Sequence, residues 1–285
     1  MKKRPKTPAK FTILMYTSKL NKAIYFPKNN MKIVYGPVAS WRLGESLGVD
    51  LTCKPGKICT FDCIYCQLAK TIAITSKKDN YINISSMEKE LQKALKQKSP
   101  DVVTLSGMGE PTLAKNIDEV IKTIRRNTDV PIAILTNSTL LNDVEVQNSL
   151  KKIDIIVAKL DASNEKLFQE INQPATGITF KQTIDGIKNM RKQFKGKFAI
   201  QTMFIENNKN HIDEFVKILK EIQPDELQIN TPLRPSNIKP LSREELKDIE
   251  REFSDFNTIN VYDSVKPKVE PLDMEELYRR RRMEP

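Results

Sequence analysis

The sequence predicts an α/β protein in which β-α units repeat around a parallel sheet. From about residue 46 onward, short apolar runs rich in β-branched residues alternate with longer amphipathic stretches. The short runs are apolar almost throughout, as expected of strands that are covered on both faces. With 39% hydrophobic and 29% charged residues in 285 positions, the chain can form a substantial core and is too apolar to be disordered.

Six apolar runs are predicted strands, and most are followed by a stretch with helical periodicity. The strands are expected at residues 47–51, 102–105, 132–135, 153–160, 198–205 and 226–229. Between them, helices are expected at residues 87–97, 117–126, 143–150, 165–171, 180–194 and 212–222. Ser86 is the expected cap of the first helix.

The end of the chain adds one helix and one strand to this pattern. Ser242 is followed three residues later by Glu245, a capping-box signature that predicts a helix at 242–253. A last strand is expected at 258–262. We divide the chain into a basic N-terminal arm (1–30), a folded core (31–262) and a basic C-terminal tail (263–285). The two basic ends are interpreted as arms that contact phosphates or as solvated tails.

Charge and hydropathy restrict the partners and the compartment. A net charge of +11 favours an anionic partner, such as nucleic acid, an acidic electron-transfer protein or a phosphorylated substrate. No run approaches the roughly 20 apolar residues of a membrane helix. The apolar run at 11–16 is shorter than the centre of a signal peptide and lacks a cleavage site. We therefore expect a cytoplasmic protein with no membrane partner.

The four cysteines crowd into one short segment, which favours metal or redox chemistry over a disulfide scaffold. Cys59, Cys63 and Cys66 have the spacing C-x3-C-x2-C on a loop past the first predicted strand. Three thiolates can hold three irons of a four-iron cluster and leave the fourth iron without a protein ligand. A zinc site made by these three together with Cys53 is the alternative.

This spacing and its context resemble the radical S-adenosylmethionine (radical SAM) superfamily. The resemblance implies two cofactors, a [4Fe-4S] cluster and S-adenosylmethionine (SAM), with SAM chelated by the open iron. It implies that one electron from the cluster cleaves SAM to a 5′-deoxyadenosyl radical, which takes a hydrogen atom from the substrate. It also implies a reductant such as flavodoxin or ferredoxin, and a position near the adenine for Tyr65.

A glycine-containing segment, Gly107-Met108-Gly109-Glu110, follows the second predicted strand directly. Its glycines allow the backbone to approach a ligand closely. The segment resembles the Gly-Gly-Glu motif of the same superfamily, whose backbone holds the amino group of the methionine moiety. The resemblance makes Gly107, Gly109 and Glu110 predicted cofactor-binding residues.

Polar residues also lie at the ends of the later predicted strands, where the chemistry of barrel enzymes gathers. Lys159 and Asp161 share one face of the fourth strand, because side chains alternate along a strand. A buried lysine beside an aspartate is costly unless the two pair or meet a ligand. They are the predicted catalytic residues, and a structural ion pair is the alternative. The remaining predicted cofactor-binding residues are Asn137, Ser138, Gln201 and Asn230.

From Tyr35 to about Phe253, the chain resembles a branch of short radical SAM enzymes similar to the wyosine-forming tRNA enzymes. The stretches that carry this resemblance are 35–38, 42–44, 46–49, 106–113, 160–162 and 230–235. It implies a partial (β/α)6 TIM-like barrel of the radical SAM type, and a tRNA base as a candidate substrate.

The chain also departs from that branch. It has Trp41 and Gln173 where relatives often have arginine, Lys159 where they have serine, and no second set of cysteines. These departures leave room for a peptide, a protein or a small metabolite as substrate. A non-catalytic RNA-binding protein that carries zinc or an iron-sulfur cluster is a further alternative.

Overall fold

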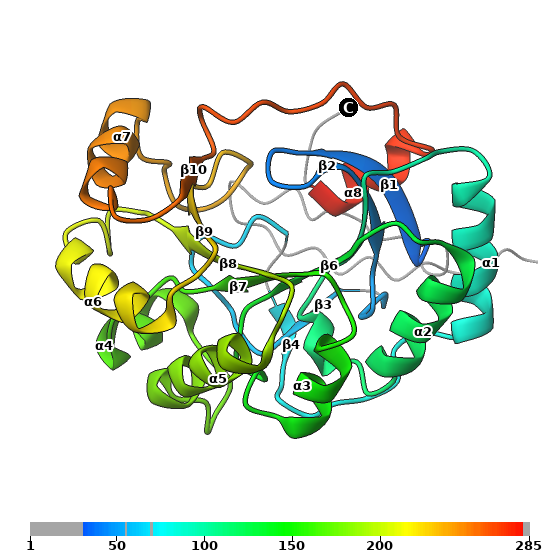
Figure 1. Ribbon diagram of the computed structural model, residues 1–285, viewed down its shortest axis with the longest axis horizontal. Helices are drawn as coiled ribbons and strands as arrows, with labels where there is room; N and C mark the ends of the chain where they lie inside the picture. The colour runs from blue at the N-terminus through cyan, green and yellow to red at the C-terminus, as the bar shows by residue number, and fades with distance from the viewer. Residues whose placement is uncertain (1–30, 55, 69–70, 282–285) are drawn as a thin grey trace, which may run out of the picture.

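The computed structural model describes residues 31–281, except 55 and 69–70, so the predicted arm at 1–30 lies outside the described residues. Its main feature is one eight-stranded sheet that curls into a half barrel (Figure 1). In spatial order the strands are β1 (Val34–Ser40), β2 (Gly44–Val49), β5 (Val102–Leu105), β6 (Ile132–Thr136), β7 (Ile155–Lys159), β8 (Lys197–Met203), β9 (Glu226–Asn230) and β10 (Thr258–Asn260). All neighbours are parallel except β1 and β2. The predicted α/β partial barrel is therefore confirmed.

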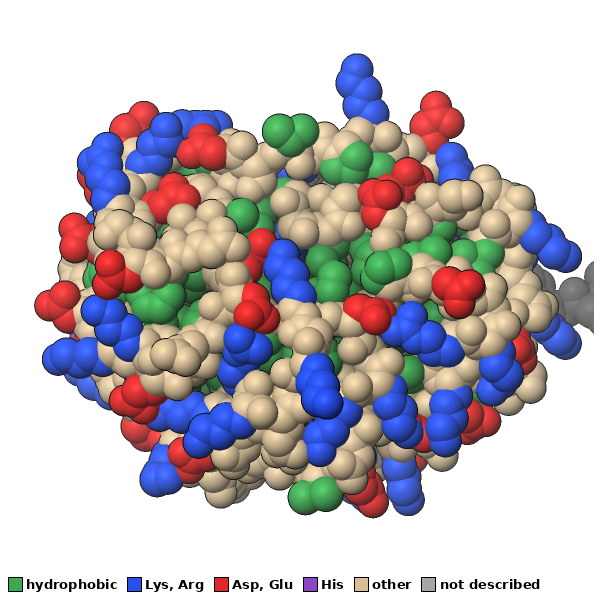
Figure 2. Space-filling model, in the orientation of Figure 1, with side chains coloured by type: hydrophobic (Ala, Val, Ile, Leu, Met, Phe, Trp, Pro, Cys, Tyr) green, Lys and Arg blue, Asp and Glu red, His purple; other side chains and the backbone are tan. Residues whose placement is uncertain are grey.

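Helices ring the outside of the curled sheet (Figure 1). They are α1 (Ile84–Leu95), α2 (Ile117–Asn127), α3 (Val144–Leu150), α4 (Glu165–Leu167), α5 (Phe180–Gln193), α6 (Ile212–Ile222) and α7 (Arg243–Glu252). In the same orientation, Figure 2 shows apolar side chains near the centre of this face, with charged side chains beside them and toward the edges. Lys and Arg alternate there with Asp and Glu.

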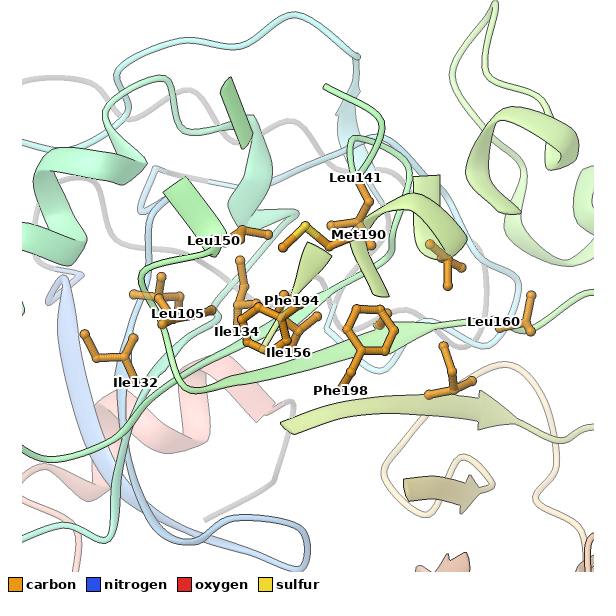
Figure 3. Close-up of a cluster of buried hydrophobic side chains, with 14 of the residues drawn as sticks. Leu105, Ile132, Ile134, Leu141, Leu150, Ile156, Leu160, Met190, Phe194 and Phe198 are labelled. Atoms are coloured by element: carbon orange, nitrogen blue, oxygen red, sulfur yellow. The ribbon is translucent and has the colours of Figure 1, made fainter. Parts of the chain in front are cut away.

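The core fills the layer between the strands and the outer helices. Ile134, Ile156 and Phe198 come from three neighbouring strands and are fully buried. Figure 3 shows them beside Met190 and Phe194 of the α5 region. The Phe194 and Phe198 rings meet edge to face, with centroids 6.3 Å apart. Burying this layer is the main stabilising contribution to the barrel and fixes the positions of the strand ends.

The predicted N-terminal cap is confirmed for one helix and is wrong for another. The capping box of Ser242 and Glu245 at the start of α7 is confirmed. The first helix begins earlier than predicted, because the side chain of Asn83 accepts a hydrogen bond from the backbone N–H of Ser86. Ser86 is therefore inside the helix, and its prediction as the cap is wrong. The cap is an asparagine three residues upstream, which has the same capping chemistry.

The predicted helix at 165–171 divides into α4 and a π-helical turn, η2 (Phe168–Asn172). Two short elements also lie around the loops: a 3-10 turn, η1 (Pro111–Leu113), and a two-stranded parallel sheet of β3 (Lys57–Cys59) and β4 (Thr71–Ile74). Strand β1 was not predicted, because Gly36 and Pro37 interrupt its apolar pattern and its pairing with β2 shifts register there.

The C-terminal segment returns to the start of the barrel. After β10 the chain crosses to α8 (Met274–Arg281), which lies beside β1 (Figure 1). The backbone N–H of Leu272 donates to the carbonyl of Gly36 at 2.7 Å. Arg280 is buried and pairs with Asp50 and Glu276. The expectation of a flexible or solvated tail is wrong for Arg280, because two carboxylates compensate its charge. The division at residues 30 and 262 stays a prediction.

No helix in the described part of the chain combines the length and the apolar character needed to cross a membrane.

Candidate functional site

The cysteine loop begins at the end of β3 and is hydrogen-bonded through its backbone to the π-helical turn η2. The backbone N–H groups of Asp62 and Ile64 donate to the carbonyls of Asn172 and Ile171, at 3.1 and 3.0 Å. In a π-helical turn the hydrogen-bond register of the helix is interrupted, and such turns are frequent at functional sites. Here the turn supplies acceptors to the loop and holds its backbone in place.

Side-chain amides from the end of β6 and from η2 are directed at two thiols of the loop. Cys59 is buried, and Cys63 and Cys66 are half-buried. The side-chain amide of Asn137 lies 3.5 Å from the sulfur of Cys59, and that of Asn172 lies 3.5 Å from the sulfur of Cys63. Burial raises the pKa of Cys59 to about 12 and that of Cys63 to about 11, although Lys57 acts in the opposite direction.

Lys57 is a site residue that was not predicted. It is buried, and its ammonium donates to the hydroxyl of Thr71 at 2.7 Å. Burial disfavours the charge of Lys57, but the nearby sulfurs of Cys59, Cys66 and Cys63 outweigh burial and raise its pKa. The available signal was the alternation along β3, which places Lys57 on the same face as Cys59.

This donor set fits an iron-sulfur cluster. Three soft thiols, two amide donors directed at sulfur and one buried ammonium suit a negatively charged iron-thiolate group. Cys53 lies elsewhere: its thiol contacts the carbonyls of Met31 and Lys32, each at 3.6 Å, and the guanidinium of Arg280 at 3.8 Å. Within the described residues, no three His, Cys, Asp or Glu side chains are grouped closely enough to hold a metal ion, and this includes Cys59, Cys63 and Cys66, which would have to draw together around a cluster. The placement of Cys53 does not favour the four-cysteine zinc site.

Both glycines of the Gly107–Glu110 segment lie against other parts of the chain. A Cβ atom on Gly107 would lie 2.1 Å from the carboxyl carbon of Asp50, and one on Gly109 would lie 1.8 Å from the carbonyl oxygen of Ile58. Asp50 also accepts a hydrogen bond from the backbone N–H of Met108 at 3.2 Å. The glycines therefore allow the segment to pack between the end of β2 and the start of the cysteine loop.

Glu110 joins this segment to the end of β6. Its buried carboxylate accepts hydrogen bonds from the backbone and hydroxyl of Thr112, from the hydroxyl of Thr136 and from the backbone N–H of Asn137, at 2.7 to 3.0 Å. Burial raises the pKa of Glu110, and these hydrogen bonds offset part of that rise. Glu110 thus places Asn137 beside Cys59.

Asp161 is the centre of a buried polar cluster. One of its oxygens accepts hydrogen bonds from the hydroxyl of Tyr65 and from the amide of Asn172, the latter at 3.3 Å. Its other oxygen accepts from the backbone N–H of Met203 at 2.8 Å and lies 3.2 Å from the ammonium of Lys159. Burial and the charge of Asp161 raise the pKa of Tyr65 well above its ordinary value. The predicted pair of Lys159 and Asp161 is therefore formed, and it extends to the cysteine loop through Tyr65.

Lys159 differs from Asp161 because part of its side chain remains exposed. The exposed fractions are 21% for Lys159 and 1% for Asp161. The Lys159 ammonium also lies 3.3 Å from the amide oxygen of Gln201 and 5.3 Å from the centre of the Tyr65 ring. Four of the predicted site residues thus meet at the ends of β7 and β8.

The other predicted residues occupy neighbouring positions. Asn137 borders a small cavity of about 10 Å³ together with Lys159 and Asp161. Ser138 is buried, and its hydroxyl donates to the carbonyl of Lys159 at 2.9 Å. Asn230 accepts a hydrogen bond from the backbone of Thr231, and its side chain is otherwise at the border of a larger cavity.

The larger cavity has a volume of about 250 Å³ and lies inside the half barrel. It reaches from β1 and β2 to the loops after β9 and β10. Gly107, Asn230 and Gln67, the residue after Cys66, line it, so it borders both the glycine segment and the cysteine loop. Its size suits part of a small organic molecule.

Comparison with known proteins gives three related findings. A family model described as the radical SAM superfamily matches residues 53–219. The UPF0026 protein slr1464 of Synechocystis sp. is 40% identical over 217 residues, which cover 74% of this chain and 78% of that protein. A probable GTP 3′,8-cyclase of Saccharolobus islandicus is 27% identical over 217 residues, which cover 74% of this chain and 64% of that protein.

Among solved structures, SuiB of Streptococcus suis bound to S-adenosylmethionine has a similar fold. The TM-score is 0.52 at 19% identity, and the match covers 72% of this chain and 47% of SuiB. This chain therefore matches about half of the length of SuiB.

Proposed function

The chain belongs to the radical SAM superfamily, and from this premise we propose that it removes a hydrogen atom from a substrate held in the larger cavity. The enzymes of this family use a [4Fe-4S] cluster and SAM. When bound, these cofactors supply a 5′-deoxyadenosyl radical by one-electron cleavage of a carbon-sulfur bond in SAM. A non-catalytic role does not fit a family of enzymes.

In this proposal Cys59, Cys63 and Cys66 would hold the cluster. The observation that carries it is that these thiols lie on a loop fastened to η2, with amide donors at 3.5 Å from two of the sulfurs. Hydrogen bonds to sulfur and a nearby cation stabilise negative charge on thiolates. Lys57 would therefore favour the cluster-bound, ionised state of the loop.

Residues around the thiols would bind SAM. The backbone of Gly107 and Gly109 would receive the methionine end, and Glu110 would keep that segment at the correct distance from β6. Tyr65, anchored by its hydroxyl to Asp161, would pack near the adenine. Asn137, Ser138, Gln201 and Asn230 complete the set of proposed cofactor-binding residues.

Lys159 and Asp161 would have unequal roles. The side chain of Lys159 is partly exposed, and its ammonium would contact the carboxylate or ribose of SAM, or the substrate. Asp161 is buried and uses both oxygens within the chain, so it would position Lys159 and Tyr65 instead of contacting a ligand. This division combines the predicted functional role with the alternative of a structural pair.

The substrate and the electron donor are also part of the proposal. A tRNA base remains a candidate, supported by the net charge of +11 and by the resemblance to the wyosine-forming branch. The name of the Saccharolobus relative supports a smaller phosphorylated substrate. The net charge of +11 would also favour docking of an acidic flavodoxin or ferredoxin as reductant.

The test is an assay of SAM cleavage on protein reconstituted with iron and sulfide without oxygen. Dithionite and SAM are added, and 5′-deoxyadenosine is measured by mass spectrometry together with the iron content. We expect about four irons per chain, as a cubane cluster requires, and formation of 5′-deoxyadenosine. Replacing Cys59, Cys63 or Cys66 with alanine should abolish both.

Cys53→Ala is the matched control. It removes a cysteine thiol from the same segment of the chain, but this thiol contacts Arg280 and not the other three cysteines. It should retain the iron and the activity. Wild-type protein with a full iron content that yields no 5′-deoxyadenosine would contradict the proposal. Loss of iron from Cys53→Ala alone would instead favour a site that includes all four cysteines.

A further inference from the structure

Three buried polar side chains form a row on the inner face of the half barrel. They are Gln201 on β8, and Gln228 and Glu226 on β9, with exposed fractions of 6%, 1% and 7%. Ile200 and Leu227, next to them in the chain, belong to the apolar core under the helices, so alternation turns the row to the opposite face. Buried amides and carboxylates are costly unless their polar atoms have partners. The row therefore depends on hydrogen bonds within the barrel.

Hydrogen bonds connect this row to Lys159 in a single direction. The ammonium of Lys159 donates to the amide oxygen of Gln201 at 3.3 Å. The amide nitrogen of Gln201 donates to the amide oxygen of Gln228 at 3.4 Å, and that of Gln228 donates to the carboxylate of Glu226 at 2.8 Å. Strand register aligns these groups, because Gln201 is the partner of Lys159 on β7 and of Gln228 on β9. Each group thus donates to the next, from Lys159 to Glu226.

The two ends of this chain of hydrogen bonds fix its direction. An ammonium can only donate hydrogen bonds, and an ionised carboxylate can only accept them. A reversed Gln228 amide would set its oxygen against the carboxylate of Glu226. A reversed Gln201 amide would set its NH₂ group against the ammonium of Lys159. Both reversals bring like charges together, so Glu226 acts through Gln228 to keep the oxygen of Gln201 toward Lys159.

The charge of Glu226 is compensated at the outer end of the row. Its second carboxylate oxygen lies 2.7 Å from the ammonium of Lys197, whose side chain is 42% exposed. The first oxygen accepts the hydrogen bond from Gln228. Burying a carboxylate is costly, and a neutral amide in its place could still bond to Gln228. What only the carboxylate supplies is an acceptor that cannot become a donor.

We propose that Glu226 and Gln228 are positioning residues, which act through Gln201 to hold the ammonium of Lys159 in place for its ligand. This inference rests on the proposed function, because it concerns the ligand contact assigned there to Lys159. Asp161 lies 3.2 Å from the same ammonium, so one acceptor comes from the end of β7 and another from β8. Two fixed acceptors restrict the ammonium to one place before a ligand binds, as a preorganised contact requires.

The first test measures Lys159 itself and needs no cofactor. The full-length protein is treated with a low concentration of acetic anhydride, and acetylation of each lysine is quantified by mass spectrometry of peptides. Glu226→Gln should raise the acetylation rate of Lys159 roughly 3- to 10-fold, because the ammonium loses a fixed acceptor and yields the reactive free amine more readily. In a Gln201→Met background the link is already cut, so Glu226→Gln should leave this rate unchanged.

Glu250→Gln is the matched control. It removes from α7 a carboxylate that also accepts a hydrogen bond from an amide, that of Asn260 at 3.1 Å, and it has no contact with the row. Acetylation of Lys159 should proceed at the wild-type rate in this variant. Gln228→Met, which cuts the row beside Gln201, is the second test variant and should change the rate in the same direction as Glu226→Gln.

The second test links the row to the reaction. In reconstituted protein, Glu226→Gln should lower the rate of 5′-deoxyadenosine formation roughly 3- to 10-fold, the value of one hydrogen bond. When Lys159 is already methionine, Glu226→Gln should cause no further loss, because the row acts only through Lys159. Glu250→Gln should keep the wild-type rate. Urea denaturation of each variant shows that it remains folded.

Three results would overturn the inference. The first is an acetylation rate of Lys159 that Glu226→Gln does not change. The second is a rise that is equally large in the Gln201→Met background, since Glu226 would then act by another route. The third is a loss of 5′-deoxyadenosine formation that is the same with and without Lys159.

The two proposals fail separately in this design. Wild-type protein with its full iron content that forms no 5′-deoxyadenosine contradicts the radical reaction, and the acetylation rates still decide whether the row holds Lys159. Acetylation rates that follow the prediction, together with unchanged 5′-deoxyadenosine formation in Glu226→Gln, contradict the positioning role and leave the radical reaction standing.

Discussion

Two buried pairs of opposite charge lie in the same half barrel and are built differently. Arg280 and Asp50 are both almost fully buried, with exposed side-chain fractions of 3% and 1%. Arg280 also contacts Glu276 and the carbonyl of Lys32. Lys159, in contrast, pairs with the buried Asp161 at 3.2 Å and keeps 21% of its side chain exposed.

The difference separates a structural pair from one that can serve a ligand. Burial disfavours the charge of Arg280, but Asp50, Tyr35 and Glu276 together outweigh burial and raise its pKa. The positive charge of Arg280 is thus compensated within the chain, and its contact with Asp50 joins α8 to the end of β2. The side chain of Lys159 stays partly exposed beside a cavity. Asp161 and Asp50 each accept three further hydrogen bonds, so the two pairs differ in the exposure of the cation and not in the support of the carboxylate.

Breaking the fully buried pair should have the largest effect on stability. Arg280→Met would leave Asp50 charged, buried and without its cation. We expect a loss of about 3–5 kcal/mol in the free energy of unfolding, as for other buried pairs that lose one partner. Urea denaturation followed by circular dichroism measures this loss.

The control for this prediction is the double variant Arg280→Met with Asp50→Asn, which removes both charges. It should recover part of the lost stability, because Asp50 no longer carries an unpaired buried charge. The recovery should be incomplete, because the buried Glu276 loses Arg280 in both variants and keeps Arg279 at 3.9 Å. If Arg280→Met loses less than about 1 kcal/mol, a value typical of exposed pairs, α8 does not hold Asp50 as the structure describes.

Removing the cation of the pair at β7 should have a small effect on stability and a large effect on activity. Lys159→Met removes a cation that is 21% exposed, against 3% for Arg280, and leaves Asp161 with its three other hydrogen bonds, so we expect a stability loss of only about 1–2 kcal/mol. Formation of 5′-deoxyadenosine should fall by roughly tenfold or more, as expected when a charged contact to a ligand is lost. The SAM-cleavage assay and urea denaturation on the same preparation check both values. A large stability loss with normal activity would make this pair structural as well.

The same two pairs show what a sequence can and cannot predict. Lys159 and Asp161 are two residues apart on one strand, so the alternation of side chains was sufficient to identify them. Arg280 and Asp50 are 230 residues apart, and no local pattern connects them. A run of basic residues at the end of the chain resembles a solvated tail until its partners are known.

The strands show the same difference between features that local sequence determines and features that depend on distant partners. The six core strands were predicted because each is a continuous apolar run, which depends only on local composition. Strand β1 was missed because Gly36 and Pro37 interrupt it, and only its pairing with β2 makes it a strand. Asn172, which contacts both Cys63 and Asp161, was missed because the π-helical turn that orients it gives no periodic signal.

Glu214, whose side chain is 43% exposed, is the reference for the two buried pairs. Its replacement should change the free energy of unfolding least. Glu214 accepts hydrogen bonds from the Ser163 hydroxyl at 2.6 Å, from Asn164 at 2.8 Å and contacts His211 at 3.0 Å. The hydrogen bond from Ser163, followed by those from His211 and Asn164, lowers the pKa of Glu214 from 4.5 to about 2. A lowered pKa means that the ionised form stabilises the folded state above pH 4.5, and that this stability is lost as the pH falls toward 2.

Glu214→Gln should therefore lower stability at about pH 7 and have less effect at about pH 3, where the wild-type protein has already lost part of this contribution. Because the Glu214 side chain is 43% exposed, solvent screening should keep the difference at pH 7 below about 1 kcal/mol. Urea midpoints of both proteins across this pH range measure it. A loss as large as that of Arg280→Met would mean that burial does not set the strength of these charge interactions, and the contrast between the two buried pairs would then need another cause.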